Sequence, residues 1–191
     1  MKKIILLVAF IIIQKSVFAQ TTWKNDAAHS HLQFTITHLA VSDVDGVFKN
    51  FEVTITTTKP DFSDAVFNLK AETASVNTSD DQRDTHLKGA DFFDVATYPM
   101  LTYKSTKIAK VNPGKYKLTG NLTLHGVTKS ITMDLWYRGT ILNPITKVND
   151  AGFQLTGTLK RADFNLGNKF SPPLLSDEVQ IKAAGEFAEA K

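Results

Sequence analysis

The amino-acid sequence predicts an all-β fold: an antiparallel, eight-stranded barrel with one or two short helices covering an end. Apolar and polar residues alternate with a period of two through most of the chain, as in strands with one buried and one solvated face. Turn residues such as Asn112-Pro113-Gly114 separate these runs without a helix-length insertion, which favours antiparallel hairpins. A sandwich and a closed barrel both hide the sheet edges, and the number and length of the strands favour the barrel.

Each predicted strand has an apolar face, and together these faces supply the candidate core. The interval between Phe48 and Phe51 breaks the alternation and predicts a bulge at Lys49-Asn50 that would curve the strand. The alternation indicates about eight strands. In chain order their apolar faces include Phe34 and Ile36, Phe51 and Val53, Phe67 and Leu69, Leu101 and Tyr103, Leu118 and Leu122, Ile131 and Leu135, Phe153 and Leu155, and Val179 and Ile181.

One segment has the signals of a helix. Ser79 and Gln82 form a capping box at its start, and Gly89 ends it. Phe92 and Phe93 follow in a charged turn, where two adjacent phenylalanines are costly to solvate, so we expect them to cover an open end of the sheet. Residues 39–44 are expected to form a second short helical turn.

The first 19 residues have the three parts of a cleaved signal peptide. Residues 1–3 are cationic, residues 4–13 are all apolar, and Val17-Phe18-Ala19 ends the segment. A membrane anchor needs roughly 20 apolar residues, so ten are too few. We expect cleavage after Ala19, which leaves residues 20–191 as a single domain in the periplasm or outside the cell.

The charge pattern gives no reason to expect nucleic acid or an anionic surface as a partner. The chain has 22 basic and 19 acidic residues, and Lys2, Lys3 and Lys15 of the predicted signal account for the whole excess. No later apolar run approaches membrane length, so the mature chain is not expected to span a membrane.

No catalytic signature is present in the sequence. The chain has no cysteine, which removes thiol catalysis and thiolate metal sites. His29 and His31 could form a metal-binding H-x-H pair on one strand face, but no glutamate follows before Glu52. His38 is expected to be either a neutral core histidine or a residue at a cavity mouth. We therefore expect neither enzymatic activity nor a bound metal or cofactor.

An ordered set of short motifs resembles the YceI-like domain family between Trp23 and Phe187. Each motif is weak alone, but their order along the chain is specific. The motifs are Asp26-Ala27-Ala28-His29-Ser30, Phe34-x-Ile36-x-His38-Leu39, Gly46-x-Phe48, Arg83-Asp84-x-His86-Leu87-Lys88, Asp91-Phe92-Phe93-Asp94, Tyr98-Pro99, the hairpin at 120–129, Arg161-Ala162-Asp163-Phe164 and Asp177-x-Val179-x-Ile181.

The resemblance implies an extended, lipocalin-like antiparallel barrel with an apolar tunnel. This tunnel would hold an isoprenoid quinone or a polyprenyl phosphate in the periplasm, and the protein would act as carrier, store or scavenger. Residues 139–152 form a longer connection than the family pattern. His38, Arg161 and Phe92-Phe93 would lie near the mouth or plug of the tunnel. The residues expected to bind the ligand are Phe34, Ile36, His38, Phe51, Val53, Phe67, Leu69, Phe92, Phe93, Tyr103, Leu118, Leu122, Ile131, Leu135, Phe153, Arg161 and Phe164.

Two alternatives remain open at the level of sequence. One is an envelope stress protein with a packed core that acts through contacts with other proteins. The other is a metal protein that uses His29 and His31. The sequence also leaves open whether the chain forms a homodimer. A hollow, apolar interior would favour lipid binding over the packed core.

Overall fold

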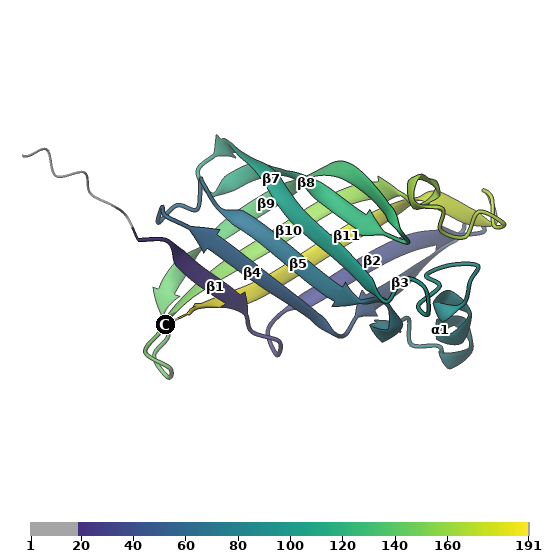
Figure 1. Ribbon diagram of the computed structural model, residues 1–191, viewed down its shortest axis with the longest axis horizontal. Helices are drawn as coiled ribbons and strands as arrows, with labels where there is room; N and C mark the ends of the chain where they lie inside the picture. The colour runs from purple at the N-terminus through teal and green to yellow at the C-terminus, as the bar shows by residue number, and fades with distance from the viewer. Residues whose placement is uncertain (1–18, 191) are drawn as a thin grey trace, which may run out of the picture.

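The computed structural model describes residues 19–190, in which eleven strands, one α-helix and two 3-10 turns follow one another (Figure 1). Residues 1–18, which make up the predicted signal peptide except for Ala19, lie outside the described residues. The elements are β1 (Thr21–Asn25), β2 (His31–His38), β3 (Ser42–Phe48), β4 (Phe51–Thr57), β5 (Val66–Glu72), η1 (Thr73–Ser75), β6 (Val76–Asn77), α1 (Asp81–Lys88), β7 (Met100–Asn112), β8 (Lys115–Leu124), β9 (Val127–Leu142), β10 (Asn149–Lys160), η2 (Arg161–Phe164) and β11 (Leu175–Glu189).

The strands close into an antiparallel barrel, as the alternation predicts. The sheet order runs β1-β4-β5-β7-β8-β9-β10-β11, and β1 also pairs with β11, which closes the ring. The long strands β7 to β11 cross the barrel obliquely (Figure 1). Within residues 19–190 the barrel therefore has eight strand positions, which confirms the predicted fold class.

Three of these positions are occupied by interrupted strands. Both β1 and β2 pair with β11, at opposite halves of its length. In the same way β4 pairs with β1 and β3 pairs with β2, and the break between them is Lys49-Asn50, where the sequence predicts a bulge. The turn η1 separates β5 from β6. Because β6 pairs only with β3 among the described strands, the wall is open beside it, and α1 lies at this end (Figure 1).

The helix α1 lies where the sequence predicts it, but two details of the helical predictions need correction. The residue that caps α1 is Asp80 rather than Ser79, because the Asp80 carboxylate accepts a hydrogen bond from the backbone amide of Arg83 at 2.9 Å. Gly89 ends the helix as expected. The second helical turn predicted at residues 39–44 is wrong: the chain makes a tight hairpin there and continues as β3. No helix of the described part of the chain has both the length and the apolar character needed to cross a bilayer.

An aromatic cluster packs the barrel at the end opposite α1. Phe62, in the loop between β4 and β5, is almost fully buried and occupies the centre of this cluster. Its ring centroid lies 5.3 Å from that of Trp23, 4.8 Å from Tyr137 and 5.0 Å from Phe153. Aromatic contacts of this kind each add about 0.5–1.5 kcal/mol to simple burial. This end of the barrel is therefore closed by side chains.

Candidate functional site

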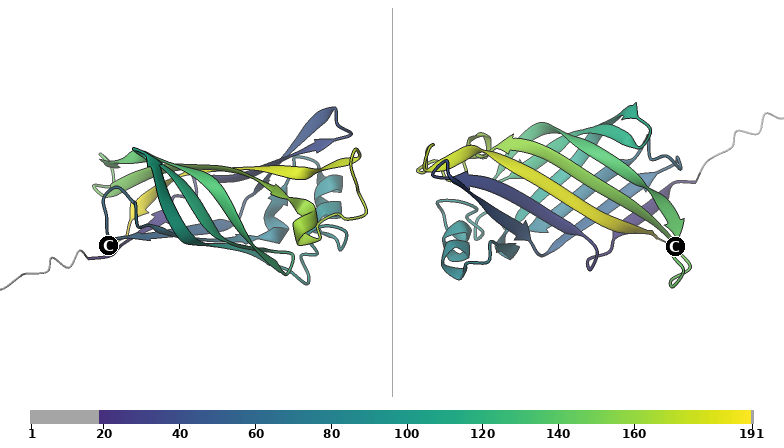
Figure 2. Two further views of the ribbon diagram at one scale, coloured as in Figure 1. Left: turned by 90° about the horizontal axis from the view of Figure 1, so that it is seen from above. Right: turned by 180° about the vertical axis from the view of Figure 1, so that it is seen from behind.

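The other part of the barrel encloses a cavity of about 490 Å³. Its walls are inward-facing apolar side chains from β2 to β5 and from β7 to β11. The lining includes His86 of α1 and Phe170, so the cavity extends to the end where α1 and residues 165–174 lie. Figure 2 shows that these two segments lie at the same end of the barrel. Pockets for small ligands occupy roughly 300–1,000 Å³ and are mostly apolar, so this cavity has the size and surface of a binding chamber.

The burial of the inward-facing residues shows where the barrel is hollow. Near the aromatic cluster, Ile55 and Phe62 are almost fully buried and do not line the cavity, because other side chains cover them. Leu155, Leu159 and Ile181 line the cavity and are only half-buried. Their apolar surface therefore faces an accessible space instead of a packed core. The interior is hollow and apolar, the condition that distinguishes the lipid-binding hypothesis from the packed-core alternative.

All but one of the residues predicted to bind a ligand lie on the cavity wall. Phe164 is the exception: its side chain is buried behind the wall, and its carbonyl oxygen lies 3.1 Å from Nδ1 of His125. The wall residues are Phe34, Ile36, His38, Phe51, Val53, Phe67, Leu69, Phe92, Phe93, Tyr103, Leu118, Leu122, Ile131, Leu135, Phe153 and Arg161.

Arg161 contributes to the wall, but its guanidinium is fully occupied within the protein. A guanidinium has five N–H donors, and those of Arg161 donate to five backbone carbonyls. Burial lowers the pKa of Arg161 from its ordinary value, and nearby Asp177 acts in the opposite direction. The side chain therefore holds the loop beside the mouth and has no donor left for a ligand. The acceptors are Leu166 at 2.8 Å, Gly167 at 2.7 Å, Ser176 at 2.9 Å, Leu175 at 3.1 Å, and Phe170.

His38 lies at the mouth of the cavity, which was one of its two expected positions. It is the last residue of β2 and is exposed. Deeper in the chamber, burial raises the pKa of Tyr103 to about 12, so this phenol stays protonated at neutral pH. Arg83 and Arg161, both at the mouth end, are the only Asp, Glu, Lys or Arg side chains on the described cavity wall, so the deeper part of the chamber carries no charged side chain of these types.

Several mouth residues were missed by the sequence reasoning because they lie outside the regular strands. Phe92 and Phe170 stack with ring centroids 5.1 Å apart and an interplanar angle of 13°. The His86 ring packs edge-on against both. Arg83, one helical turn from His86, donates from Nε to the Thr78 hydroxyl at 2.7 Å. The i, i+3 spacing of Arg83 and His86 could have indicated a shared helix face, but no periodicity predicts Phe170. The wall residues missed at this end are Thr78, Arg83, His86, Leu87, Leu166, Phe170 and Leu174.

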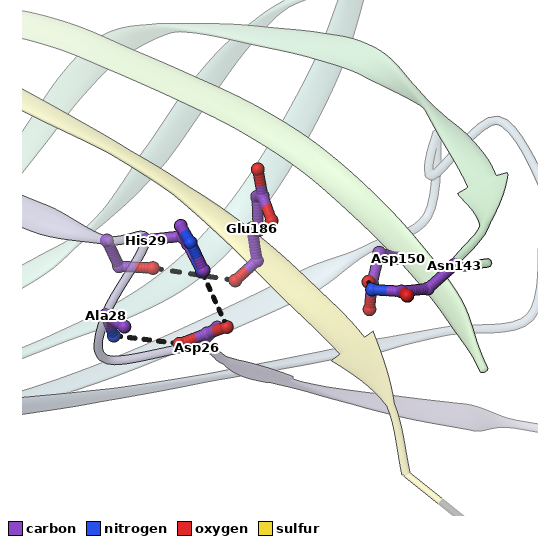
Figure 3. A network of polar contacts seen from close by, with 7 residues as sticks. Asp26, Ala28, His29, Asn143, Asp150 and Glu186 are labelled. Atoms are coloured by element: carbon purple, nitrogen blue, oxygen red, sulfur yellow. Dashed lines mark hydrogen bonds and ion pairs between the residues drawn. The ribbon is translucent and has the colours of Figure 1, made fainter. Parts of the chain in front are cut away.

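His29 lies in the turn between β1 and β2, where its ring contacts the side chain of Asp26. His29 precedes β2, so the assumption that it shares a strand face with His31 is wrong. Its Nδ1 lies 2.8 Å from the Asp26 carboxylate, and this contact, with smaller contributions from Glu186 and Asp150, raises the pKa of His29. Figure 3 shows the ring turned toward Asp26 in the turn between β1 and β2. No group of three His, Cys, Asp or Glu side chains suited to a metal occurs among residues 19–190.

Comparisons with known proteins agree with this architecture. A YceI-like domain model matches residues 23–187. A UPF0312 protein of Pectobacterium carotovorum is 35% identical over 173 residues, which cover 91% of this chain and 88% of the relative. The crystal structure of the Campylobacter jejuni YceI protein superposes with a TM-score of 0.75 at 34% identity, covering 82% of this chain and 91% of that one.

A second solved structure shares the fold at lower sequence identity. It is described as a polyisoprenoid binding domain from Saccharophagus degradans, and it superposes with a TM-score of 0.65 at 20% identity, covering 89% of this chain and 98% of that one. The family model spans nearly all of the described residues, and it matches from the first barrel strand to the last. The chain belongs to the YceI-like domain family.

Proposed function

We propose that this protein holds a long isoprenoid lipid in its barrel cavity and acts as a carrier, store or scavenger rather than as an enzyme. The single observation that carries the proposal is the open, apolar chamber of about 490 Å³, lined from nearly every strand. A solved structure of the same fold is described as a polyisoprenoid binding domain, which supports this ligand class.

Hydrophobic transfer supplies the binding energy in this proposal. Each buried CH₂ contributes about 0.8 kcal/mol, so ten such groups contribute about 8 kcal/mol before the cost of association. Beyond Arg83 and Arg161 at the mouth end, the described wall contains no Asp, Glu, Lys or Arg, so an apolar chain that enters the deeper chamber desolvates no such charge. Arg83 and His86 line the mouth end of the cavity, where the quinone ring or the phosphate of such a lipid would lie.

Native mass spectrometry tests the proposal directly. Protein purified from cells that express the full-length sequence is expected to carry a co-purified isoprenoid, released by organic extraction and identified by its mass ladder of prenyl units. Ligand-free protein should take up a labelled polyprenyl chain. A folded protein that carries no lipid and takes up no labelled polyprenol would contradict the proposal.

We place this function in the periplasm or outside the cell, because residues 1–19 have the pattern of a cleaved signal peptide. The purified protein is expected to begin at Gln20, as measured by intact mass and N-terminal sequencing. Replacing the small residue before the cut, Ala19→Lys, should leave a precursor that retains residues 1–19. Wild-type protein that keeps Met1 would show that the segment is not removed.

A further inference from the structure

Two exposed loops at the open end of the barrel form an uncharged surface. His38 ends β2 and residues 39–41 connect it to β3, residues 171–174 precede β11, and the Leu39 amide donates to the Leu174 carbonyl at 3.0 Å. Neither loop contains Asp, Glu, Lys or Arg, and every residue in both is exposed. The exposed fractions are 50% for Leu39, 83% for Val41 and 42% for Leu174. We call residues 38–41 and 171–174 the apolar rim.

The hairpin at 38–41 has apolar residues at positions where a left-handed backbone favours Gly or Asn. Leu39 and Ala40 both have positive φ, 52° and 58°, and the Val41 amide donates to the His38 carbonyl at 3.1 Å. Residues 39–41 form the three-residue loop between His38 and its strand partner Ser42, and its first two positions are left-handed, a backbone conformation that favours Gly and Asn over Leu and Ala. Leu-Ala at this tip therefore costs conformational free energy, and such strain often marks a functional segment.

The apolar rim is continuous with the cavity. His38 and Leu174 belong both to the rim and to the cavity wall. In the left view of Figure 2, the β2–β3 hairpin projects beyond the barrel at the same end as α1. An apolar path therefore leads from the exposed tip of the hairpin into the chamber.

We infer that the apolar rim docks onto a lipid bilayer, from which the isoprenoid enters the cavity without crossing water; this inference rests on the proposed function. A long prenyl chain resides in membranes, and each CH₂ that leaves the bilayer for water meets the full hydrophobic penalty. Docking of the rim removes that step because the hydrocarbon region of the bilayer then adjoins the apolar path.

The dimensions and the charge of the rim favour a bilayer over a second copy of the chain. Stable protein interfaces bury roughly 800 Å² on each partner, far more than the side chains of Leu39, Val41 and Leu174 can supply. A brief insertion of three apolar side chains into a membrane surface needs no such area, and the rim contains no Asp, Glu, Lys or Arg whose charge would have to be desolvated. Weak docking also allows the protein to leave with its lipid.

A rim variant can be made without disrupting the hairpin. The triple substitution Leu39→Asn, Ala40→Gly and Val41→Thr removes the exposed apolar side chains and gives the turn its preferred residues. Its thermal unfolding midpoint should equal or exceed that of the wild type. Ile145→Asn is the matched control, because Ile145 is 88% exposed in the hairpin at the opposite end of the barrel.

The measurement is the transfer of a fluorescent polyprenol between phosphatidylethanolamine–phosphatidylglycerol vesicles. Because membrane binding scales with the apolar area inserted, the triple variant should transfer polyprenol at least about 10-fold more slowly than the wild type. The Ile145→Asn control should match the wild type. All three proteins should bind farnesol, an isoprenoid short enough to be supplied from solution, with equal affinity.

The outcomes separate failure of the rim from failure of the proposed function. If the wild type and the triple variant transfer polyprenol at equal rates and both bind farnesol, the inference that the rim docks onto a bilayer is overturned, and the proposed function stays intact. Wild-type protein that binds neither isoprenoid would overturn both. A dimer in sedimentation that the triple variant abolishes would show that the rim joins two copies of the chain and would also overturn bilayer docking.

Discussion

Replacing Ala183 with tryptophan is expected to abolish most isoprenoid binding while leaving the barrel folded. Ala183 lies on β11, faces the cavity, and is only half-buried there. An indole at this position would occupy space needed by roughly three to five CH₂ groups, about 2.4–4 kcal/mol at 0.8 kcal/mol each, which weakens binding roughly 50- to 900-fold. Because the ring enters an apolar space, the free energy of unfolding should change by less than about 1.5 kcal/mol.

The control is the neighbouring residue of the same strand. Lys182 is exposed on the outer face, so Lys182→Trp adds the same ring without entering the cavity. Titration with farnesol, followed by competition with a longer polyprenol, should give wild-type affinity for Lys182→Trp and strongly reduced affinity for Ala183→Trp. Equal affinity in the two variants would show that the ligand lies elsewhere on the protein.

The walls of the cavity could be predicted from sequence because strand periodicity reports one thing reliably, namely which side chains share a face. Phe153 and Leu155 follow the period-two rule on β10, and the structure turns both inward. Periodicity does not report whether the space between facing walls is filled. Ile55 and Leu159 both stand on the apolar side of an alternating run, yet Ile55 is fully buried in the packed part of the barrel and Leu159 is half-buried on the cavity wall.

The mouth could be predicted only in part, because irregular segments follow tertiary contacts instead of a repeat. Residues 39–44 are apolar enough to suggest a helical turn, but pairing of β3 with β2 forces a tight hairpin there. Phe170 is adjacent to no periodic run, and its position depends on stacking with Phe92 from a segment about eighty residues away in the chain. Such long-range contacts override local propensity.

Arg161 shows why a residue can be placed correctly and its role still be missed. The family resemblance implies a position near the mouth and a place among the residues that bind the ligand. The structure directs every donor of its guanidinium to a backbone carbonyl between residues 166 and 176. These carbonyls belong to a loop with no regular secondary structure for most of its length, so few other groups are available to pair them. The loop therefore depends on one side chain for its conformation.

Substitution of Arg161 by methionine is accordingly expected to destabilise the protein by about 3–5 kcal/mol, the usual cost of removing one side of a buried charged hydrogen-bond network. Lys160→Met is the matched control: Lys160 is adjacent and exposed, and its loss should change stability by no more than about 0.5 kcal/mol. Urea unfolding measures both. Arg161→Lys should be intermediate because an ammonium has three donors in place of five.

The same Arg161 variants, examined by hydrogen exchange and lipid binding, separate a structural role for Arg161 from a ligand-binding one. If the guanidinium holds the mouth loop, hydrogen exchange at residues 166–176 should accelerate in Arg161→Lys even without lipid, because the loop opens locally when its carbonyls lose donors. Lipid binding would then weaken only as far as the mouth is disordered. An Arg161→Met protein with wild-type stability and wild-type exchange, but without lipid binding, would instead show that Arg161 acts on the headgroup. The five carbonyl acceptors lead us to expect the first result.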